Sequence, residues 1–273
     1  MSKKATCLAP PCLLAVSKKP WPWMSPDAAE RERFAATLRS AVWLVLFNNF
    51  CVALPAVYIS HWANRGKDMM STSLEAWPSM FTIVWQIMVC VAIDDTTFYF
   101  VHRMLHMKAL YPYVHKWHHH FHHVVAISAE SSHPIEFLVS SVSGVFAGAV
   151  LLKVHLAVFW MFVWLRLSEG LDAHSGYAFP WSPFRLLPFL VPTEAHDYHY
   201  SHNVGCFGSQ FVFWDRVMGT DASFKAHWVK RYADDAAASG KKTAADEGGG
   251  VSNGVRANSG QLLSSSVGKE KTV

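Results

Sequence analysis

The sequence predicts an all-α integral membrane protein with about four hydrophobic helices in two hairpins and a helical cap rich in histidine. Three observations predict this class. Hydrophobic residues make up 51% of the 273 residues and charged residues only 16%, against roughly 25% charged residues in an ordinary soluble domain. Four apolar segments approach the length of a membrane-spanning helix. Finally, 14 of the 16 histidines lie between His102 and His202.

The chain divides into three parts by composition. Residues 1–24 predict a flexible N-terminus that ends in Trp21 and Trp23, whose indole rings favour the membrane interface. Residues 25–232 hold all four apolar segments and form the predicted membrane domain, beginning with an amphipathic helix after Ser25. Residues 233–273 are rich in alanine, glycine, serine and lysine, which predicts a disordered tail.

The four apolar segments predict two helical hairpins. Ala41–Trp62 and Ser79–Val101 are each long enough to cross a hydrocarbon core, which takes about 20 residues. Phe137–Leu152 and Val154–Leu167 predict a second hairpin, but each arm has at most about 16 residues, or about 24 Å at 1.5 Å per residue. That length is marginal, so full crossing, tilted insertion and partial insertion all stay open for this hairpin.

An even number of crossings places both termini on one side of the membrane. The segment ends that face this side carry most of the arginines and lysines, so the positive-inside rule makes it the cytosol. Gly144 and Gly148 form a small-xxx-small pair, which would allow two helices to pack closely.

Other classes of protein are disfavoured by the cysteines and the basic residues. The five cysteines are odd in number and form no C-x-x-C pair, which argues against a disulfide scaffold and a thiolate zinc module. The net charge of +4 comes largely from lysines and arginines near the termini and the segment ends. No basic stripe is interleaved with aromatic residues, so we do not expect nucleic acid as a partner.

Three histidine clusters carry the chemistry. The first is His102 and His106, and the second contains the sequence His115-Lys116-Trp117-His118-His119. The third is His196 and His199, three residues apart. Such spacings place imidazoles on one face of a helix, where they can converge on one ion. Neutral imidazole suits iron, copper and zinc, and these ligands are too many for one ion, which predicts two metals.

A histidine-rich site beside apolar helices fits oxygen chemistry on a lipid. Two irons can activate O2, and the oxidant can then attack a C–H bond of a substrate that stays in the bilayer. Carboxylates that orient metal-bound imidazoles are expected around such a site. Six carboxylates are candidates: Asp94, Asp95, Glu130, Glu136, Asp172 and Asp197. We predict the role for Asp94, Asp95, Asp172 and Asp197.

These clusters resemble those of the membrane-bound fatty acid hydroxylase/sterol desaturase superfamily, whose signature is H-x3-H, H-x2-HH and H-x2-HH. The likeness covers roughly residues 80–225 and is greatest to the 4-methylsterol oxidases. It rests on the three clusters and on H-P-I-E from His133, D-A-H-S-G-Y from Asp172, F-P-W-S-P from Phe179 and W-D-R with G-T-D from Trp214. The resemblance implies stepwise oxidation of a sterol C-4 methyl group. It further implies O2, two iron ions (Fe2+/Fe3+) and electrons from NAD(P)H through cytochrome b5 and its NADH reductase.

The metal ligands that the resemblance implies are drawn from all three clusters. They are His102, His106, His115, His118, His119, His174, His196 and His199. The chain departs from the pattern at Tyr200, where the third cluster should end in histidine, and His202 is a candidate replacement ligand. His133 is a further candidate, whereas His120, His122 and His123 extend the second cluster beyond the family pattern, and we expect second-layer or solvated positions for them.

The sequence carries no glycine-rich nucleotide motif after a strand and no C-x-x-C-H haem attachment, so electrons are expected from a partner protein. The final five residues, from Lys269, resemble a dilysine retrieval signal, which predicts a multi-pass protein of the endoplasmic reticulum. Sterol C-5 desaturation and fatty acid hydroxylation remain alternatives within the superfamily. A histidine-rich metal transporter and a catalytically weakened relative are alternatives of other classes.

Overall fold

The computed structural model describes residues 14–15, 21–65, 67–121 and 124–238. Most of residues 1–20, His122, His123 and the tail beyond Ala238 with its terminal lysine motif therefore lie outside the described residues. The chain divides into two compact units, Met1–Phe224 and Lys225–Val273. The first unit is almost wholly helical and contains every histidine cluster, which confirms the predicted fold class.

Helices account for nearly all described elements, and the only strand pair is two residues long within the described part of the chain. The elements are β1 (Leu14–Ala15), η1 (Pro22–Met24), α1 (Ala28–Phe47), η2 (Asn48–Ala53), α2 (Leu54–Ala63), η3 (Leu74–Ala76), α3 (Met80–Leu105), η4 (His115–His120), η5 (Ala126–Ala129), α4 (Pro134–Glu136), η6 (Phe137–Val142), α5 (Ser143–Leu151), α6 (Leu156–Ala173), β2 (Tyr177–Ala178), η7 (Pro183–Arg185), α7 (Thr193–His202), α8 (Phe213–Met218) and α9 (Ala222–Ala238).

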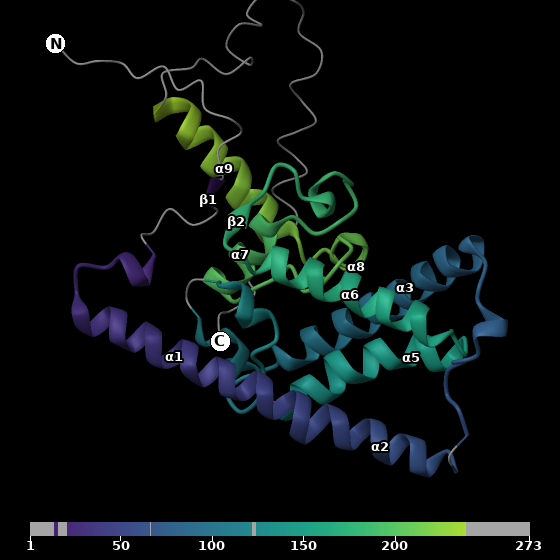
Figure 1. Cartoon of the computed structure of the whole chain (residues 1–273). Helices are drawn as coiled ribbons and strands as arrows, with labels where there is room; N and C mark the ends of the chain where they lie inside the picture. Colours follow the sequence, from purple (N-terminus) through teal and green to yellow (C-terminus); the bar gives the residue numbers. More distant parts are fainter. Residues whose placement is uncertain (1–13, 16–20, 66, 122–123, 239–273) are drawn as a thin grey trace, which may run out of the picture. The chain divides into compact units, whose positions relative to one another are not determined.

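The first apolar segment is part of one long helix rather than a separate one. Asp27 caps it by accepting a hydrogen bond from the backbone N–H of Ala29 at 2.9 Å, and α1, η2 and α2 then continue without a break to Ala63 (Figure 1). The π-helical stretch η2 precedes Pro55, which has no backbone N–H to donate to the preceding turn. A proline inside a helix thus accounts for the local change in winding.

The glycine pair packs α5 against α3, as its spacing predicts. A methyl group on Gly148 would lie 2.9 Å from Cα of Cys90, and one on Gly144 would lie 2.5 Å from Oδ1 of Asp94. Gly144 and Gly148 are four residues apart on α5, and so are Cys90 and Asp94 on α3. One face of α5 therefore packs closely along one face of α3. No larger side chain fits this contact without a shift of the helices.

Helix α6 returns from the far end of α5 to the histidine clusters. At its start, His155 forms a bridge with Ser71, in the connection between the first two apolar segments. At its end, Nε2 of His174 lies 2.8 Å from Nε2 of His196. The fourth apolar segment therefore runs from the connection between the first two segments back to the histidines. It completes the second hairpin beside α3 and α5 (Figure 1).

Among the described residues, three helical segments are long and apolar enough to cross a membrane: Ala28–Ala63, Met80–Leu105 and Pro134–Leu151. Helix α6 is not among them, because its 18 residues include the charged residues Arg166, Glu169 and Asp172. These charges lie in its last turns, near the histidines, and its earlier turns are apolar. The prediction of about four apolar helices in two hairpins is thus confirmed, and α6 is the helix that falls outside the set of candidate membrane spans.

The buried core lies between α3, α5 and α6 and contains Ile83, Val91, Val158 and Phe162 among others. Many large apolar side chains on the outside of the apolar helices are exposed, including Trp43 of α1, at 72%, and Trp164 of α6, at 71%. Such a surface is costly in water and suits contact with lipid. At the other end of the chain, α9 extends to Ala238, five residues past the predicted start of the tail at residue 233.

Candidate metal centre

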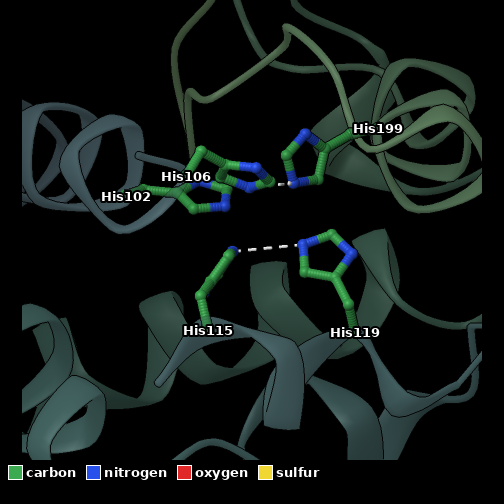
Figure 2. Close-up of side chains that lie close together, drawn as sticks. All are labelled: His102, His106, His115, His119 and His199. Atoms are coloured by element: carbon green, nitrogen blue, oxygen red, sulfur yellow. Dashed lines mark hydrogen bonds between the residues drawn. The ribbon is translucent and has the colours of Figure 1, made fainter. Parts of the chain in front are cut away.

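Five imidazoles converge at the end of α3. His102 and His106 come from α3 and its C-terminal cap, His115 and His119 from η4, and His199 from α7. One nitrogen from each ring lies within 4.8 Å of one nitrogen from every other ring. Figure 2 shows these rings facing a common space, with His115 and His119 opposite the other three. We call these residues the five-histidine group.

Outer hydrogen bonds fix the direction of three of these rings. Nδ1 of His102 donates to the carbonyl oxygen of Phe207 at 2.9 Å, and Nδ1 of His199 donates to that of Gly205 at 2.6 Å. Nδ1 of His115 lies 2.8 Å from Oε1 of Glu136. With the proton on Nδ1, the Nε2 lone pair of each ring points inward, which is the arrangement of metal-binding histidines.

The inward nitrogens satisfy one another only in part. Nε2 of His106 lies 3.2 Å from Nε2 of His199, and Nε2 of His119 lies 3.1 Å from Nε2 of His115. Each such pair can share at most one proton. Nε2 of His102 and Nδ1 of His119 are buried without a hydrogen-bond partner. Buried lone pairs of this kind are costly unless a cation binds them.

A second group lies beside the first and contains His118, His174, His196 and Tyr200. Nε2 of His196 is 2.8 Å from Nε2 of His174, and the hydroxyl of Tyr200 is 2.5 Å from Nε2 of His118. Nδ1 of His118 donates to the carbonyl of Ser131 at 3.2 Å, and Nδ1 of His174 donates to that of Gly170 at 2.8 Å. We call these four residues the second group.

Burial keeps these imidazoles neutral at physiological pH. It lowers the pKa of His118 and of His199 to about 4, and that of His174 to about 3. Burial also lowers the pKa of His106 to about 2, with a further contribution from the nearby His199. Neutral imidazole is the metal-binding form, so the histidines of both groups are already in the state that coordinates.

The donor chemistry of both groups suits transition metals. Each group offers several neutral imidazole nitrogens, the second adds a phenol oxygen, and both are anchored from outside by hydrogen bonds. Imidazole with oxygen suits iron better than calcium or magnesium, which prefer oxygen ligands alone. The geometry thus divides the predicted ligands into two sets, with the adjacent His118 and His119 in different sets.

Two predicted candidates are not brought to these groups. His202 is exposed, its ring stacks on Tyr198 and its Nδ1 lies 3.1 Å from the carbonyl oxygen of Tyr198. Nδ1 of His133 accepts a hydrogen bond from Ile135 N–H at the start of α4. Tyr200, by contrast, places its hydroxyl in the second group, where the sequence pattern lacks its last histidine.

Two of the four predicted carboxylates act on the histidine rings indirectly, through a loop. Oδ1 of Asp95 accepts from the backbone N–H groups of Gln210 and Phe211 at 2.8 and 3.0 Å, and Asp94 binds Gln210 and Arg166. They therefore hold the 207–211 loop, whose Phe207 carbonyl orients His102. Asp172 and Asp197 are half-buried on α6 and α7, and a ring-orienting role for them stays a prediction.

Sequence reasoning assigned no role to Asp215, which also supports this loop. Its carboxylate accepts from the backbone N–H groups of Phe207 and Gly208 at 2.9 and 2.8 Å and from the Thr220 hydroxyl at 2.6 Å. Asp215 and Thr220 belong to the W-D-R and G-T-D stretches, which the sequence analysis had noted. The sequence did not reveal their partner, because the carboxylate binds backbone N–H groups, which no side-chain pattern indicates.

Sequence comparisons identify a family and several relatives of this chain. The fatty acid hydroxylase family model matches residues 87–220. Methylsterol monooxygenase 1 of Rattus norvegicus is 37% identical over 190 residues, which cover 68% of this chain and 63% of the rat protein. C-4 methylsterol oxidase of Schizosaccharomyces pombe is 33% identical, covering 73% of this chain and 67% of the relative.

A third relative carries a different name. Very-long-chain aldehyde decarbonylase of Oryza sativa subsp. indica is 36% identical over 192 residues, which cover 68% of this chain and 69% of the relative. No solved structure matches the chain significantly. The family match runs from residue 87, within α3, to just past α8, and this segment supplies every residue of both groups. The chain belongs to the fatty acid hydroxylase family.

Proposed function

We propose that this protein is a membrane-bound monooxygenase that oxidises the C-4 methyl group of sterol intermediates, through alcohol and aldehyde to acid. The observation that carries the proposal is the convergence of three histidine clusters into two adjacent groups at the end of apolar helices. The names of two relatives, a methylsterol monooxygenase and a C-4 methylsterol oxidase, support the substrate class.

The proposed cofactor is a pair of iron ions. The five-histidine group would hold one ion and the second group the other, so each ion has nitrogen ligands from at least two distant parts of the chain. When bound, iron supplies the oxygen chemistry needed to break an unactivated C–H bond. Ligands from η4 enter both sets, which would hold the two ions close to one another.

Tyr200 is the proposed replacement for the missing histidine of the third cluster. Its hydroxyl already lies within the second group, at 2.5 Å from Nε2 of His118, whereas His202 is exposed. A phenol oxygen suits ferric iron better than ferrous iron. We therefore propose that the second site is an oxygen-containing variant of an all-histidine site, which makes a weakened relative the less favoured alternative.

The chain's own residues orient ligands and keep water away. Glu136 and the carbonyls of Gly205 and Phe207 hold the Nδ1 protons of three rings, so their Nε2 atoms stay available. Burial of those rings excludes solvent from the centre. Their orientation is set before substrate arrives, which reduces the reorganisation that the reaction requires.

Electrons are proposed to come from NAD(P)H through cytochrome b5 and its NADH reductase. The sequence contains no nucleotide-binding glycine motif, which supports an external donor. The proposed location is the endoplasmic reticulum membrane, with both termini and the metal centre on the cytosolic side. Helix α6 returns to the metal centre, which supports an even number of passes through the membrane.

A second candidate function is chemistry on a long-chain aldehyde. The rice relative named a very-long-chain aldehyde decarbonylase is as similar to this chain as the sterol-named relatives. Incubation of the purified protein with NADH and microsomal electron carriers separates the two. We expect conversion of a 4,4-dimethylsterol to a 4-carboxysterol, and conversion of a long-chain aldehyde alone would replace the sterol proposal.

A further inference from the structure

A cavity of about 530 Å³ opens between the first long helix and the second hairpin. Its walls include Leu54 and Val57 of α2, Val145 of α5, and Phe159 and Val163 of α6. Two of the three candidate membrane spans contribute to it. Its volume lies within the usual range for sites that hold small organic molecules. An apolar molecule dissolved in the bilayer is the kind of occupant that these walls suit.

The polar side chains of this cavity gather at one end. Of the four polar residues in its wall, Glu130, Ser141 and Arg166 also line a second, smaller pocket, and only Asn49 does not. Residues shared by two adjoining cavities mark the junction between them. The wall of the outer cavity is therefore mostly apolar, and three of its four polar side chains lie where it meets the inner pocket.

The inner pocket leads to the second group. Its wall contains the rings of His118, His174 and His196, and none of the five-histidine group lies in that wall as far as the described residues show. Its volume is about 40 Å³. A single water-sized probe occupies about 10–15 Å³, so the pocket has room for a methyl-sized group and none for a ring.

The junction holds a loosely joined ion pair. Nη1 of Arg166 is 3.8 Å from Oε1 of Glu130, while Nε of the same guanidinium is 3.1 Å from Oδ2 of Asp94. A separation of 3.8 Å exceeds hydrogen-bond distance. A hydroxyl between the two groups would donate to the Glu130 carboxylate and accept from Arg166. The Glu130 side chain is 21% exposed, so a ligand can reach it.

We infer that the two cavities form one substrate site, in which the outer cavity holds the ring body of a sterol and the inner pocket admits one methyl substituent. Glu130 and Arg166 bind the 3-hydroxyl group, on the carbon next to C-4, and thereby act as positioning residues. This inference rests on the proposed function and adds to it where the substrate lies, which metal site it approaches and what limits the size of the oxidised group.

The test measures equilibrium binding of a tritiated 4,4-dimethylsterol to the iron-loaded protein in lipid nanodiscs. Val163→Trp fills the outer cavity, and Met161→Trp makes the same change on the exposed side of the same helix. We expect at least tenfold weaker binding for Val163→Trp and unchanged binding for Met161→Trp. Equal binding by the two variants would overturn the inference.

Glu130→Gln tests the junction. We expect its affinity for the 3-hydroxysterol to fall about tenfold, the loss of one hydrogen bond to a charged group, with no change for the 3-methyl ether. Equal losses for both sterols would remove the positioning role. Photo-cross-linking of a reactive sterol to the unmodified chain needs no variant, and we expect labelled peptides that contain Val145 or Phe159. Labels confined to other helices would contradict the cavity.

Conversion of the sterol by the unmodified protein is measured in parallel. If conversion occurs while Val163→Trp binds and converts sterol normally, the cavity assignment fails and the proposed function stands. If the sterol binds in a Val163-dependent manner and is never oxidised, the proposed function fails and the binding site stands.

Discussion

The hydroxyl of Tyr200 lies 2.5 Å from Nε2 of His118, although the two residues are 82 positions apart. Nδ1 of His118 already donates to Ser131, so its Nε2 is the acceptor of the Tyr200 proton. Burial raises the pKa of Tyr200 well above its usual value, which keeps this proton in place when no metal competes for the oxygen. The contact marks the position at which this chain departs from the histidine pattern of its family.

Substitution of Tyr200 tests its place in the second site. Tyrosine oxygen bound to ferric iron gives a charge-transfer absorption in the visible range, so we expect that band in the oxidised protein and its loss in Tyr200→Phe. Tyr200→Phe should also retain about one iron ion fewer per chain, because one ligand is lost. Tyr200→His should lose the band yet keep its iron, and His202→Ala should change neither. A band that survives in Tyr200→Phe would refute the assignment.

His119 and His120 offer a matched pair on η4. His119 belongs to the five-histidine group, whereas the adjacent His120 is exposed and lies outside it. We expect His119→Ala to lower sterol oxidation by at least 100-fold and to lose iron, and His120→Ala to stay within about twofold of the unmodified protein. Metal analysis and product formation measure both effects. Similar losses in the two variants would mean that η4 is needed for folding and not for coordination.

Glu136 orients a ring without belonging to either group. Its Oε1 is 2.8 Å from Nδ1 of His115. Carboxylates in this position typically contribute 10- to 100-fold to metal affinity or activity. We expect Glu136→Gln to retain the fold and to bind iron about tenfold more weakly, measured by competition with a chelator. Unchanged iron affinity would show that the orientation of His115 does not depend on this contact.

The pH dependence of metal-free stability follows from the lowered pKa values. His118 and His199 have an ordinary pKa of 6.5 when unfolded and about 4 when folded, because burial disfavours the charged ring. The unfolded chain therefore binds more protons between pH 6.5 and 4, and stability falls as pH falls through this range. Each group contributes a slope of about 1.4 kcal/mol per pH unit.

This effect is measured by thermal unfolding of the chelator-treated protein between pH 5 and 7.5. We expect the melting temperature to fall steadily below pH 6.5, and His199→Asn to show a shallower fall. Bound iron competes with protons for the same nitrogens, so loaded protein should resist acid better. A melting temperature that is constant across the range would contradict the buried, neutral state of these rings.

The packing of α5 on α3 gives a stability prediction. Gly148→Ala would place a methyl group 2.9 Å from Cα of Cys90, and the resulting overpacking should cost about 1–3 kcal/mol. Gly170→Ala is the matched control on α6, since its nearest neighbour atom would be 3.9 Å away. We expect a lower melting temperature for the first variant alone. Equal effects would indicate that helix propensity, and not the close approach, sets the result.

The sequence indicated that the three histidine clusters come together, but it did not indicate how their rings divide into groups. Helical spacing suggested that His115, His118 and His119 share one face, yet η4 is a tight 3-10 turn in which His119 has non-helical angles, and the two adjacent rings enter different groups. Local propensity does not reveal such a turn. The spacing of His196 and His199 on α7 was read correctly as helical, although their rings also separate.

The outer partners of the rings were the least predictable feature. Backbone carbonyls of Gly205 and Phe207 orient two ligands, in a loop where Asn203 and Cys206 adopt left-handed angles, with φ of 56° and 52°. Tertiary contacts from Asp95 and Asp215 hold this loop. The apolar segments and the glycine pair, by contrast, were evident because their periodicity and length are local properties of the chain.

Iron stoichiometry is the most direct measurement of the central claim. The detergent-purified protein, loaded with Fe2+ without air and passed over a desalting column, should retain two iron ions per chain. His119→Ala and His174→Ala should each retain about one, because each removes a ligand from a different group. Retention of no iron by the unmodified protein, or of the same amount by both variants and the unmodified chain, would contradict the account of two adjacent metal sites.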